Sequence, residues 1–429
     1  MLFGKIIYFI FLICFVYLAL SVFYLFLLSF AGRFFRFRRK MDGGSGEPVK
    51  RIAILVPAYK EDGIILSTAT HLLDADYPRA LYRVFIIADS FRPETIAALR
   101  GLAAGGPASG LRDLAGGEAT AGLRSLPLEV VEVSFDKSTK TKSLNEAFRR
   151  IPDTYDIALI CDADNMPAAD FLRRVNNAFV NGAKAVQGKR VAKNLDTPFA
   201  ILDACSEAIN NHIFRKGAYS LGLSSSVIGS GMAFEFATIR AILGEISAVG
   251  GFDKILQLKV VEQGTCIHYL EDALVYDEKV GTSQAFQQQR KRWVSSQFIY
   301  LKQFFGPACR LLLRGNGSYF NLAIANNLVL PRAFLFVLLP LLMAAGFIIG
   351  GGWFAAAVVL SLLYLFSLLM GLPRALVNKD LLVALLRLPK AIVVMVGTLF
   401  HIKKANKTFI HTVHTKTEIS NTVFKEPGK

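Results

Sequence analysis

Asp162 and Asp164 are the residues whose spacing points most directly to chemistry, because they follow an apolar run in the stretch DIALICDADN at 156–165. Alternate residues of an extended chain point the same way, so both carboxylates can converge on one ligand. Two hard oxygen ligands at a strand end suit Mg²⁺ or Mn²⁺, with substrate phosphates completing the shell. Taken alone, the common D-x-D pattern is better explained as an acidic turn.

Two further apolar runs end in polar groups in the same way. The run 84–88 is followed by Asp89, and the run 52–56 leads into Pro57, Tyr59, Glu61 and Asp62. Ligands of parallel sheets bind beyond the carboxyl ends of the strands. A turn explains each pattern equally well alone, whereas three such strand ends together indicate a binding site.

Glu271 and Asp272 form a second acidic pair, which follows the stretch 265–270. One of these carboxylates can act as a general base toward an acceptor hydroxyl if it reaches the proton and has a suitable pKa. Taken alone, the pair is better explained as an acidic pair on the surface.

The segment QRKRW at 289–293 contains Gln289, Arg292 and Trp293, in a chain with only 2 tryptophans. An indole offers a flat face on which a sugar can stack, and guanidinium groups pair bidentately with phosphate. An amphipathic helix that lies on a membrane with a basic face explains the same residues. The two interpretations are compatible.

Short apolar runs alternate with helical patterns in the region that must position these groups. We expect strands at 52–56, 84–88, 128–133 and 157–161, and helices at 63–73 and 143–150. This βαβα order predicts an α/β fold with a doubly wound, mostly parallel sheet. The segment 101–122 is rich in Gly and Ala and is expected to be a variable excursion.

The first 40 residues predict a membrane anchor. Residues 6–32 carry no charge, and at about 1.5 Å per residue they can cross a hydrocarbon core of roughly 30 Å. A cleaved signal peptide would have an apolar region of only about 7–15 residues and a small-residue cleavage site. A basic cluster follows the run, so the positive-inside rule places the next domain in the cytoplasm. The cluster consists of Arg33, Arg36, Arg38, Arg39 and Lys40.

The C-terminal part returns to the membrane. Two apolar runs, 333–350 and 353–370, are expected to span it, whereas the run 381–400 is interrupted by Arg387, Pro389 and Lys390. Charges in the bilayer centre are costly, so we expect an interfacial helix there and three spans in total. The basic tail then stays cytoplasmic, whereas a further complete span would place it outside. The lysines of the tail are Lys403, Lys404, Lys407 and Lys416.

Composition restricts the class of partner. Hydrophobic residues make up 53% of the chain, and the formal net charge is +16. Because basic residues crowd against a hydrophobic run, we assign this charge to lipid headgroups and topology rather than to nucleic acid. The 5 cysteines form no C-x-x-C pair, so neither a disulfide framework nor a structural zinc site is expected.

The order of these motifs resembles the membrane-integrated, inverting family 2 glycosyltransferases, the group that contains cellulose, chitin and hyaluronan synthases. The resemblance covers about residues 51–305 and the flanking membrane segments. It implies a GT-A-type sheet domain with transmembrane and interfacial helices. The matching segments are VPAYKED at 56–62, ADS at 88–90, KSLNEAF at 142–148, CDADN at 161–165, GSGMAF at 229–234, LED at 270–272 and QRKRW at 289–293.

The resemblance implies a role for each matched residue. The nucleotide would be bordered by Pro57, Tyr59, Glu61, Asp89, Lys142 and Asp162, with Lys142 near the diphosphate. Mg²⁺ or Mn²⁺ would be held by Asp162 and Asp164. The general base would be Asp272, beside Glu271. The diphosphate and the acceptor end would be held by Gln289, Arg292 and Trp293, and GSGMAF would line the acceptor path.

Two departures from the family pattern leave the substrate open. Leu270 stands where Thr is usual, and Asp89 is a single acid where two are usual. A UDP-sugar is the donor that the resemblance favours. Domain boundaries follow from the resemblance and the apolar runs. We expect an anchor with its basic flank at 1–40, a cytoplasmic glycosyltransferase domain at 49–285, interfacial helices at 286–320, two transmembrane helices at 321–371, and an interfacial helix with a basic tail at 380–429.

Three functions are compatible with these residues. The first is a transferase that extends a polysaccharide at the cytoplasmic face of an inner cell membrane that the chain crosses several times. The second adds one sugar to a membrane lipid, since three spans are few for a channel within one subunit. The third is a non-catalytic membrane protein or a basic nucleic-acid binder; the intact acidic set and the lack of a nucleic-acid module argue against it. The expected partners are a nucleotide sugar, a glycan or lipid acceptor and membrane lipids, while a homo-oligomer or an export partner stays open.

Overall fold

The computed structural model describes residues 2–35, 47–105, 125–246, 251–279, 281, 283–387, 389, 392, 414–421 and 423–424, with the backbone alone for 283–295. The chain forms two compact units. The sheet unit consists of residues 39–195, 226–279 and 406–429, and the helical unit consists of residues 1–38, 196–225 and 280–405. Each unit combines segments that lie far apart in the sequence, so the chain passes several times from one to the other.

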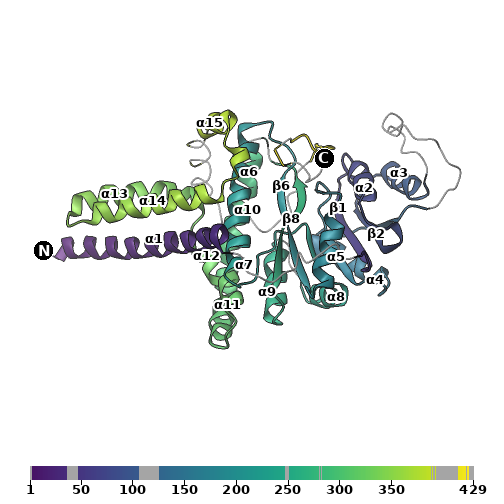
Figure 1. The fold of residues 1–429 in the computed structure, drawn as a ribbon, viewed down its shortest axis with the longest axis horizontal. Coiled ribbons are helices and arrows are strands. Elements are labelled where there is room, and N and C mark those ends of the chain that lie inside the picture. Colours follow the sequence, from purple (N-terminus) through teal and green to yellow (C-terminus); the bar gives the residue numbers. More distant parts are fainter. Residues whose placement is uncertain are drawn as a thin grey trace. The chain divides into compact units, whose positions relative to one another are not determined.

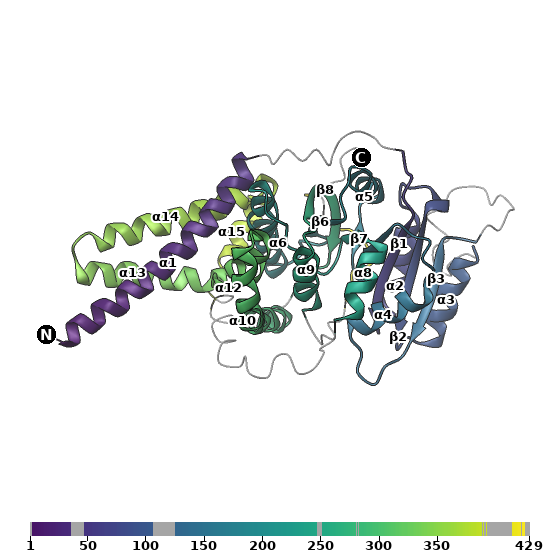
Figure 2. The ribbon, with the colours of Figure 1, turned by 90° about the horizontal axis from the view of Figure 1, so that it is seen from below.

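An eight-stranded sheet forms the middle of the sheet unit (Figures 1 and 2). Its strand order is β3-β2-β1-β4-β7-β6-β8-β5. Strands β3, β2, β1 and β4 run parallel, and so do β6 and β8, whereas β7 and β5 pair antiparallel with their neighbours. The strands are β1 (Ile52–Tyr59), β2 (Tyr82–Asp89), β3 (Leu128–Val133), β4 (Ile157–Ile160), β5 (Met166–Pro167), β6 (Ala185–Ala192), β7 (Met232–Glu235) and β8 (Ile267–Asp277).

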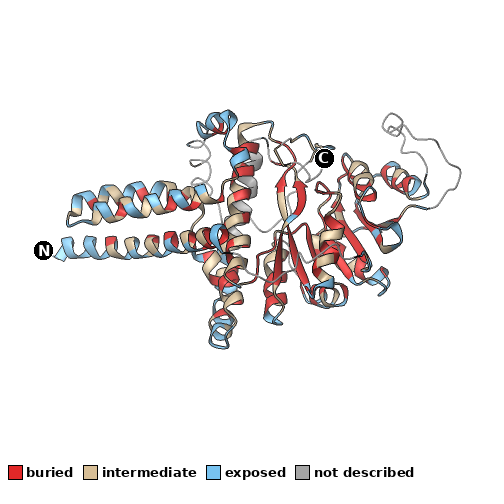
Figure 3. Ribbon diagram, viewed as in Figure 1, coloured by how far each residue is buried: buried red, intermediate tan, exposed pale blue. Residues whose placement is uncertain are grey.

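Helices pack on this sheet and complete an α/β unit. Strands β1 and β4 read as continuous apolar runs, and Ile52–Leu55 and Ile157–Ile160 are fully buried, as expected for central strands of a parallel sheet. Figure 3 shows most of both strands as buried. The predicted doubly wound, mostly parallel α/β fold is confirmed. The helices of this unit are α2 (Ile65–Leu73), η1 (Arg79–Leu81), α3 (Pro93–Ala103), α4 (Lys140–Arg150), α5 (Phe171–Val180), α8 (Phe236–Gly244) and α9 (Phe252–Glu262).

Helix α4 begins three residues before the predicted start at Ser143. Thr139 is its N-cap, and the Thr139 hydroxyl accepts a hydrogen bond from the Lys142 backbone N–H at 3.2 Å. Such a cap satisfies one of the N–H groups that the first turn leaves without a helical partner. The earlier start places Lys140 in the first turn, which matters for the site described below.

The helical unit contains three helices that are long and apolar enough to cross a membrane: α1 (Leu2–Phe34), α13 (Arg332–Ile349) and α14 (Trp353–Gly371). They cover the predicted spans 6–32, 333–350 and 353–370 to within a residue. The remaining elements are α6 (Pro198–Asn210), η2 (Asn211–Gly217), α7 (Ala218–Ser220), α10 (Ser283–Leu313), α11 (Gly317–Phe320), η3 (Asn321–Ala325), α12 (Asn326–Leu328), η4 (Arg374–Leu376) and α15 (Lys379–Leu385).

Close packing holds these apolar helices together. The Trp353 ring lies 5.4 Å from Phe11 and 5.0 Å from Phe15 between centroids, in edge-to-face arrangements. At Gly217 an added Cβ would lie 2.1 Å from the Leu28 carbonyl oxygen, so only glycine permits η2 to approach α1 this closely. Most of the remaining apolar surface of the three helices points outward (Figure 3), as expected for helices that lie in lipid.

Several sequence predictions fall on residues that the structure does not describe. Most of the basic cluster after α1 (36–40), most of the Gly- and Ala-rich segment (106–124) and the tail lysines Lys403, Lys404 and Lys407 lie outside the described residues. Within the predicted interfacial segment 381–400, the structure describes α15 and a few residues beyond it.

Candidate active site

Strands β1 and β2 end side by side, and the backbone is strained just beyond both ends. Tyr59 pairs with Asp89 at the last position of the ladder. The next residues, Lys60 and Ser90, have φ of 56° and 60°, and among the described residues they are the non-glycine residues with positive φ. This conformation costs about 1–3 kcal/mol and tends to persist where the fold requires it, often at functional sites.

Asp89 presents a buried oxygen toward this edge of the sheet. Only 1% of Asp89 is exposed, and its Oδ1 accepts a hydrogen bond from the Ser90 hydroxyl at 2.9 Å. Its Oδ2 is buried and has no hydrogen-bond partner in the part of the chain that the structure describes. A buried oxygen without a partner is costly, so the arrangement suits a ligand that donates a hydrogen bond there.

Asp162 lies directly after β4, among groups from three other segments. Its backbone N–H donates to the Ser230 hydroxyl at 2.9 Å. The Lys140 amine donates to Asp162 Oδ1 and also to the Gly229 carbonyl oxygen at 2.8 Å, and it lies 5.2 Å from the centre of the Phe252 ring. The first aspartate of the D-x-D pair is therefore charge-paired, and part of the GSGMAF segment contacts the same lysine.

Lys140 is a residue that sequence reasoning missed, because the resemblance pointed to Lys142. The Lys142 side chain is exposed, donates to the Lys137 carbonyl at 2.9 Å and lies 5.7 Å from the Phe135 ring centre. A signal was present, since the run KTK at 140–142 offers two lysines two positions apart, which point to different sides of a helix. Only the start of α4 decides which of them faces Asp162.

Asp164 and Asn165 lie deeper than Asp162. Asp164 is 6% exposed, and burial raises the pKa of its carboxyl group, with the positive charge of His414 opposing that shift and Asp277 and Asp162 adding to it. The Asn165 side chain donates to Asp277 Oδ1 at 3.0 Å, while its own Oδ1 is buried with no hydrogen-bond partner among the described residues. This loop therefore offers further oxygen atoms to a ligand.

His414 enters the same region from the C-terminal segment. Its Nδ1 lies 3.0 Å from Glu61 Oε1, and its Nε2 lies 3.9 Å from Asp164 Oδ2. Burial alone would lower the pKa of His414, but the negative charges of Asp164 and Glu61 more than offset this and raise it. Nothing local in the sequence indicates His414, because 353 positions separate it from Glu61.

These residues suit a divalent cation that also binds substrate. Asp162 and Asp164 supply hard carboxylate oxygens, which Mg²⁺ and Mn²⁺ prefer. No group of three or more His, Cys, Asp or Glu side chains among the described residues is arranged to hold a metal by itself. A metal at this position would therefore take its other ligands from phosphates and water, as Mg²⁺ commonly does.

Glu271 and Asp272 lie within β8 but outside its regular pairing. Gly188 of β6 pairs with Leu270 and the next residue, Lys189, pairs with Leu274, so Glu271, Asp272 and Ala273 have no opposite residue. Bulges of this kind re-aim side chains and are frequent beside active sites. Asp272 is exposed and Glu271 half-buried. The backbone of Gln289, Arg292 and Trp293 is part of α10, but their side chains lie outside the described residues.

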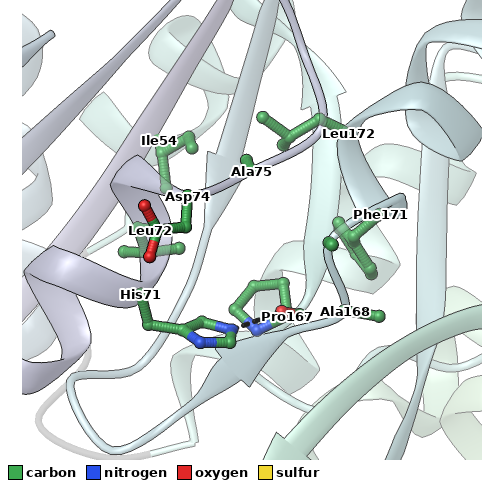
Figure 4. A pocket seen from close by; sticks show the side chains of 10 residues that line it. Ile54, His71, Leu72, Asp74, Ala75, Pro167, Ala168, Phe171 and Leu172 are labelled. Carbon is green, nitrogen blue, oxygen red and sulfur yellow. Dashed lines mark hydrogen bonds between the residues drawn. The ribbon is translucent and has the colours of Figure 1, made fainter. Parts of the chain in front are cut away.

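A small hollow beside α2 is separate from these carboxylates. Figure 4 shows it between α2 and the start of α5, with the His71 ring 2.6 Å from the Pro167 carbonyl oxygen. Apart from His71 and Asp74 its lining is apolar, and it includes none of the predicted site residues. We assign no role in the site to it.

The sheet and its carboxylate-bearing edge define the GT-A class of glycosyltransferase domains. The chain belongs to the glycosyltransferase-like family 2, whose family model matches residues 48–296. No curated protein sequence matches the chain. The resemblance to a family 2 glycosyltransferase is thus confirmed at the level of the family, while its membrane-integrated, synthase-like branch stays a prediction.

A solved structure shares the fold over most of the chain. The mannosyltransferase PcManGT from Pyrobaculum calidifontis, in complex with GDP-Man and Mn²⁺, is 19% identical, has a TM-score of 0.51, and the match covers 88% of this chain and 98% of that one. S. aureus TarS matches with 14% identity, a TM-score of 0.37 and coverage of 58% and 39%. Glucosyl-3-phosphoglycerate synthase from Mycobacterium tuberculosis matches with 14% identity, a TM-score of 0.35 and coverage of 54% and 73%. The first of these matches supports a shared fold.

Proposed function

We propose that this protein is an inverting glycosyltransferase that moves a sugar from a nucleotide donor to a growing polysaccharide at the cytoplasmic face of a membrane. The observation that carries the proposal is the meeting of Glu61, Asp89, Asp162 and Asp164 at one edge of the sheet, where β1, β2 and β4 end. A nucleoside diphosphate offers hydroxyl and amide donors for carboxylates and phosphates for a metal and a lysine.

The nucleotide part of the donor would lie at the ends of β1 and β2. The buried Oδ2 of Asp89 would accept a hydrogen bond from the base or ribose, and Pro57, Tyr59 and Glu61 would border it. The Lys140 amine would contact the diphosphate, since it already lies at Asp162. We favour UDP as the nucleotide. GDP is the alternative to test, because the Pyrobaculum mannosyltransferase is in complex with GDP-Man.

The transfer itself needs a base and a stabilised leaving group. Asp272 would take the proton from an acceptor hydroxyl, and that oxygen would attack the anomeric carbon from the face opposite the nucleotide. The bond from the anomeric carbon to the diphosphate breaks as the new bond forms, so the configuration inverts. Asp162 and Asp164 would hold Mg²⁺ or Mn²⁺, which supplies charge stabilisation for the leaving diphosphate. Gln289, Arg292 and Trp293 would bind the acceptor end.

A single transfer to a membrane lipid is the second candidate. Three helices of the described chain are long and apolar enough to span a membrane, which is few for a polysaccharide channel within one subunit. Under this alternative the acceptor would arrive from the bilayer, and the product would carry one added sugar.

The deciding experiment is a transfer assay on the full-length protein in nanodiscs. A panel of UDP- and GDP-sugars is supplied with Mn²⁺ or Mg²⁺, and products are sized by gel and mass spectrometry. A long polymer with metal-dependent release of the nucleotide supports the first proposal. One sugar on a lipid selects the second. Absence of turnover and of nucleotide binding, in protein shown to be folded, rejects both.

A further inference from the structure

A C-terminal segment of the sheet unit packs against the strands β6 and β8. We refer to residues 414–421 and 423–424 as the docked tail. Ile419 and Phe424 pack against a buried cluster, and the Tyr276 hydroxyl donates to the Phe424 carbonyl oxygen at 2.8 Å. The Asn421 side chain donates to the Ala192 carbonyl oxygen. The buried cluster consists of Met166, Ala168, Val191, Leu274 and Tyr276.

A buried lysine connects the docked tail to the backbone of the D-x-D loop. Lys193 is fully buried, and its amine donates to the Asp164 carbonyl oxygen at 3.1 Å and to the Lys416 carbonyl oxygen at 2.6 Å. The backbone N–H groups of Ser420 and Asn421 both donate to the Lys193 carbonyl oxygen at 3.1 Å. A buried amine of this kind is stable only when its donors are satisfied, so the docked tail is part of what holds Lys193 in place.

Glu278 anchors the first residues of the docked tail. Its carboxylate accepts hydrogen bonds from the Thr415 N–H at 3.2 Å and the Lys416 N–H at 3.0 Å. These bonds fix the backbone directly after His414. The imidazole is thereby aimed at the ends of β1 and β4, where it reaches Glu61 and Asp164.

His414 lies among several carboxylates. Glu61 and Asp164 come from different strand ends, both are at least nine-tenths buried, and Asp162 and Asp277 add further charge around Asp164. Carboxylates this close repel each other in a poorly solvated site. A side chain whose two ring nitrogens face two of them, as those of His414 do, keeps their oxygens in fixed positions.

We propose that the docked tail is a component of the nucleoside-diphosphate site and that His414 is a positioning residue. It holds Glu61 and Asp164 in the arrangement that the donor and its metal require. This inference rests on the proposed function, since it concerns the same site. Positioning the carboxylates before binding lowers the cost of ordering them when the donor arrives, so the docked tail supports donor binding rather than blocking it.

The test measures binding of UDP and of GDP, each with Mn²⁺, to the full-length protein by isothermal titration calorimetry. We expect His414→Ala to weaken binding of the preferred nucleotide by about 10–100-fold, the range seen when a partner of a metal ligand is lost. His414→Asn can keep a donor for Glu61 but lacks the second nitrogen that faces Asp164, and should fall between. Glu418→Ala changes an exposed side chain of the same segment and is the matched control, expected to bind like wild type.

A second variant tests the docked tail without altering His414. Ile419→Ala weakens the docking without touching a carboxylate, and should weaken nucleotide binding in the same direction while the melting temperature of the sheet unit changes little. In turnover, His414→Ala should raise the KM for the donor with kcat changed less than about threefold.

Several outcomes would overturn the inference. If folded His414→Ala binds UDP or GDP as tightly as wild type, His414 does not position the site. If it binds more tightly, the docked tail competes with the donor. In both cases wild type still binds a nucleotide and the proposed function stands. If wild type binds neither nucleotide with Mn²⁺, the proposed function itself fails, and the inference with it.

Discussion

The carboxylates at the ends of β1, β2 and β4 and the acidic pair on β8 are built in opposite ways. Glu61, Asp89 and Asp164 are 9%, 1% and 6% exposed, and each is held by groups of the fold. Asp272 is exposed and lies in a bulge, where its strand leaves the ladder. A group that only binds gains from being buried and fixed, whereas a base must meet its substrate. Under the proposed function, this difference would separate donor binding from proton transfer.

The prediction with the largest effect concerns Asp272. Asp272→Asn should lower kcat by about 10²–10⁴-fold, because the amide cannot take the acceptor proton. The affinity for UDP or GDP with Mn²⁺ should stay within about twofold, measured by calorimetry. Glu271→Gln is the neighbouring comparison, and should lower kcat less. If Glu271→Gln proved the more damaging change, the base would be assigned to the wrong member of the pair.

The next prediction concerns Asp164, which is one of the buried carboxylates. Asp164→Asn should weaken Mn²⁺-dependent nucleotide binding by at least about 100-fold, because it removes a proposed metal ligand itself, and loss of a ligand's partner already costs about 10–100-fold. The control is Asp76→Asn, which removes an exposed pair with Arg173 at 2.8 Å and should leave binding unchanged. Equal nucleotide binding by Asp164→Asn and wild type, titrated over a range of Mn²⁺ concentrations, would remove Asp164 from the metal site.

Gly188 connects the bulge to the core. A Cβ at this position would lie 2.6 Å from Phe171 Cε2 and 2.9 Å from the Ala273 carbonyl oxygen. Gly188→Ala should therefore destabilise the sheet unit by about 1–3 kcal/mol, the usual cost of overpacking, measured by urea unfolding. Because the strain falls beside Asp272, kcat should drop while nucleotide affinity is kept. A loss of nucleotide affinity with kcat kept would mean that the bulge in β8 and the nucleotide-binding edge of the sheet are structurally coupled.

The smallest expected effect on nucleotide binding comes from substituting Lys140 and Lys142 in turn. Lys140→Ala leaves Asp162 without its cation and should weaken nucleotide binding by about tenfold, as for a lost hydrogen bond between charged groups. Lys142→Ala should have a smaller effect, because its amine contacts the Lys137 carbonyl instead. If Lys142→Ala weakened nucleotide binding more than Lys140→Ala, the contact to the diphosphate would be assigned to Lys142, as the family resemblance implies.

Sequence patterns were sufficient for strands β1, β2, β3 and β4, but not for the other four strands of the sheet. The buried run at 52–56 and the alternating run at 128–133 each identify a strand, because burial on one or both faces leaves a local pattern of apolar residues. The bulge in β8 could not be predicted, since the register between β6 and β8 depends on what packs beneath Gly188. The start of α4 was missed by three residues because a polar first turn carries no apolar pattern.

The sequence alone determined that an α/β sheet carries acidic groups at several strand ends and that apolar helices long enough for a membrane flank it. Tertiary structure decided which charges meet. Lys140 and Asp162 are 22 positions apart, and His414 and Glu61 are 353 apart. Periodicity is a local property of the chain, whereas pairing between charges depends on distance in space. The partners of the carboxylates therefore became visible only once the chain was folded.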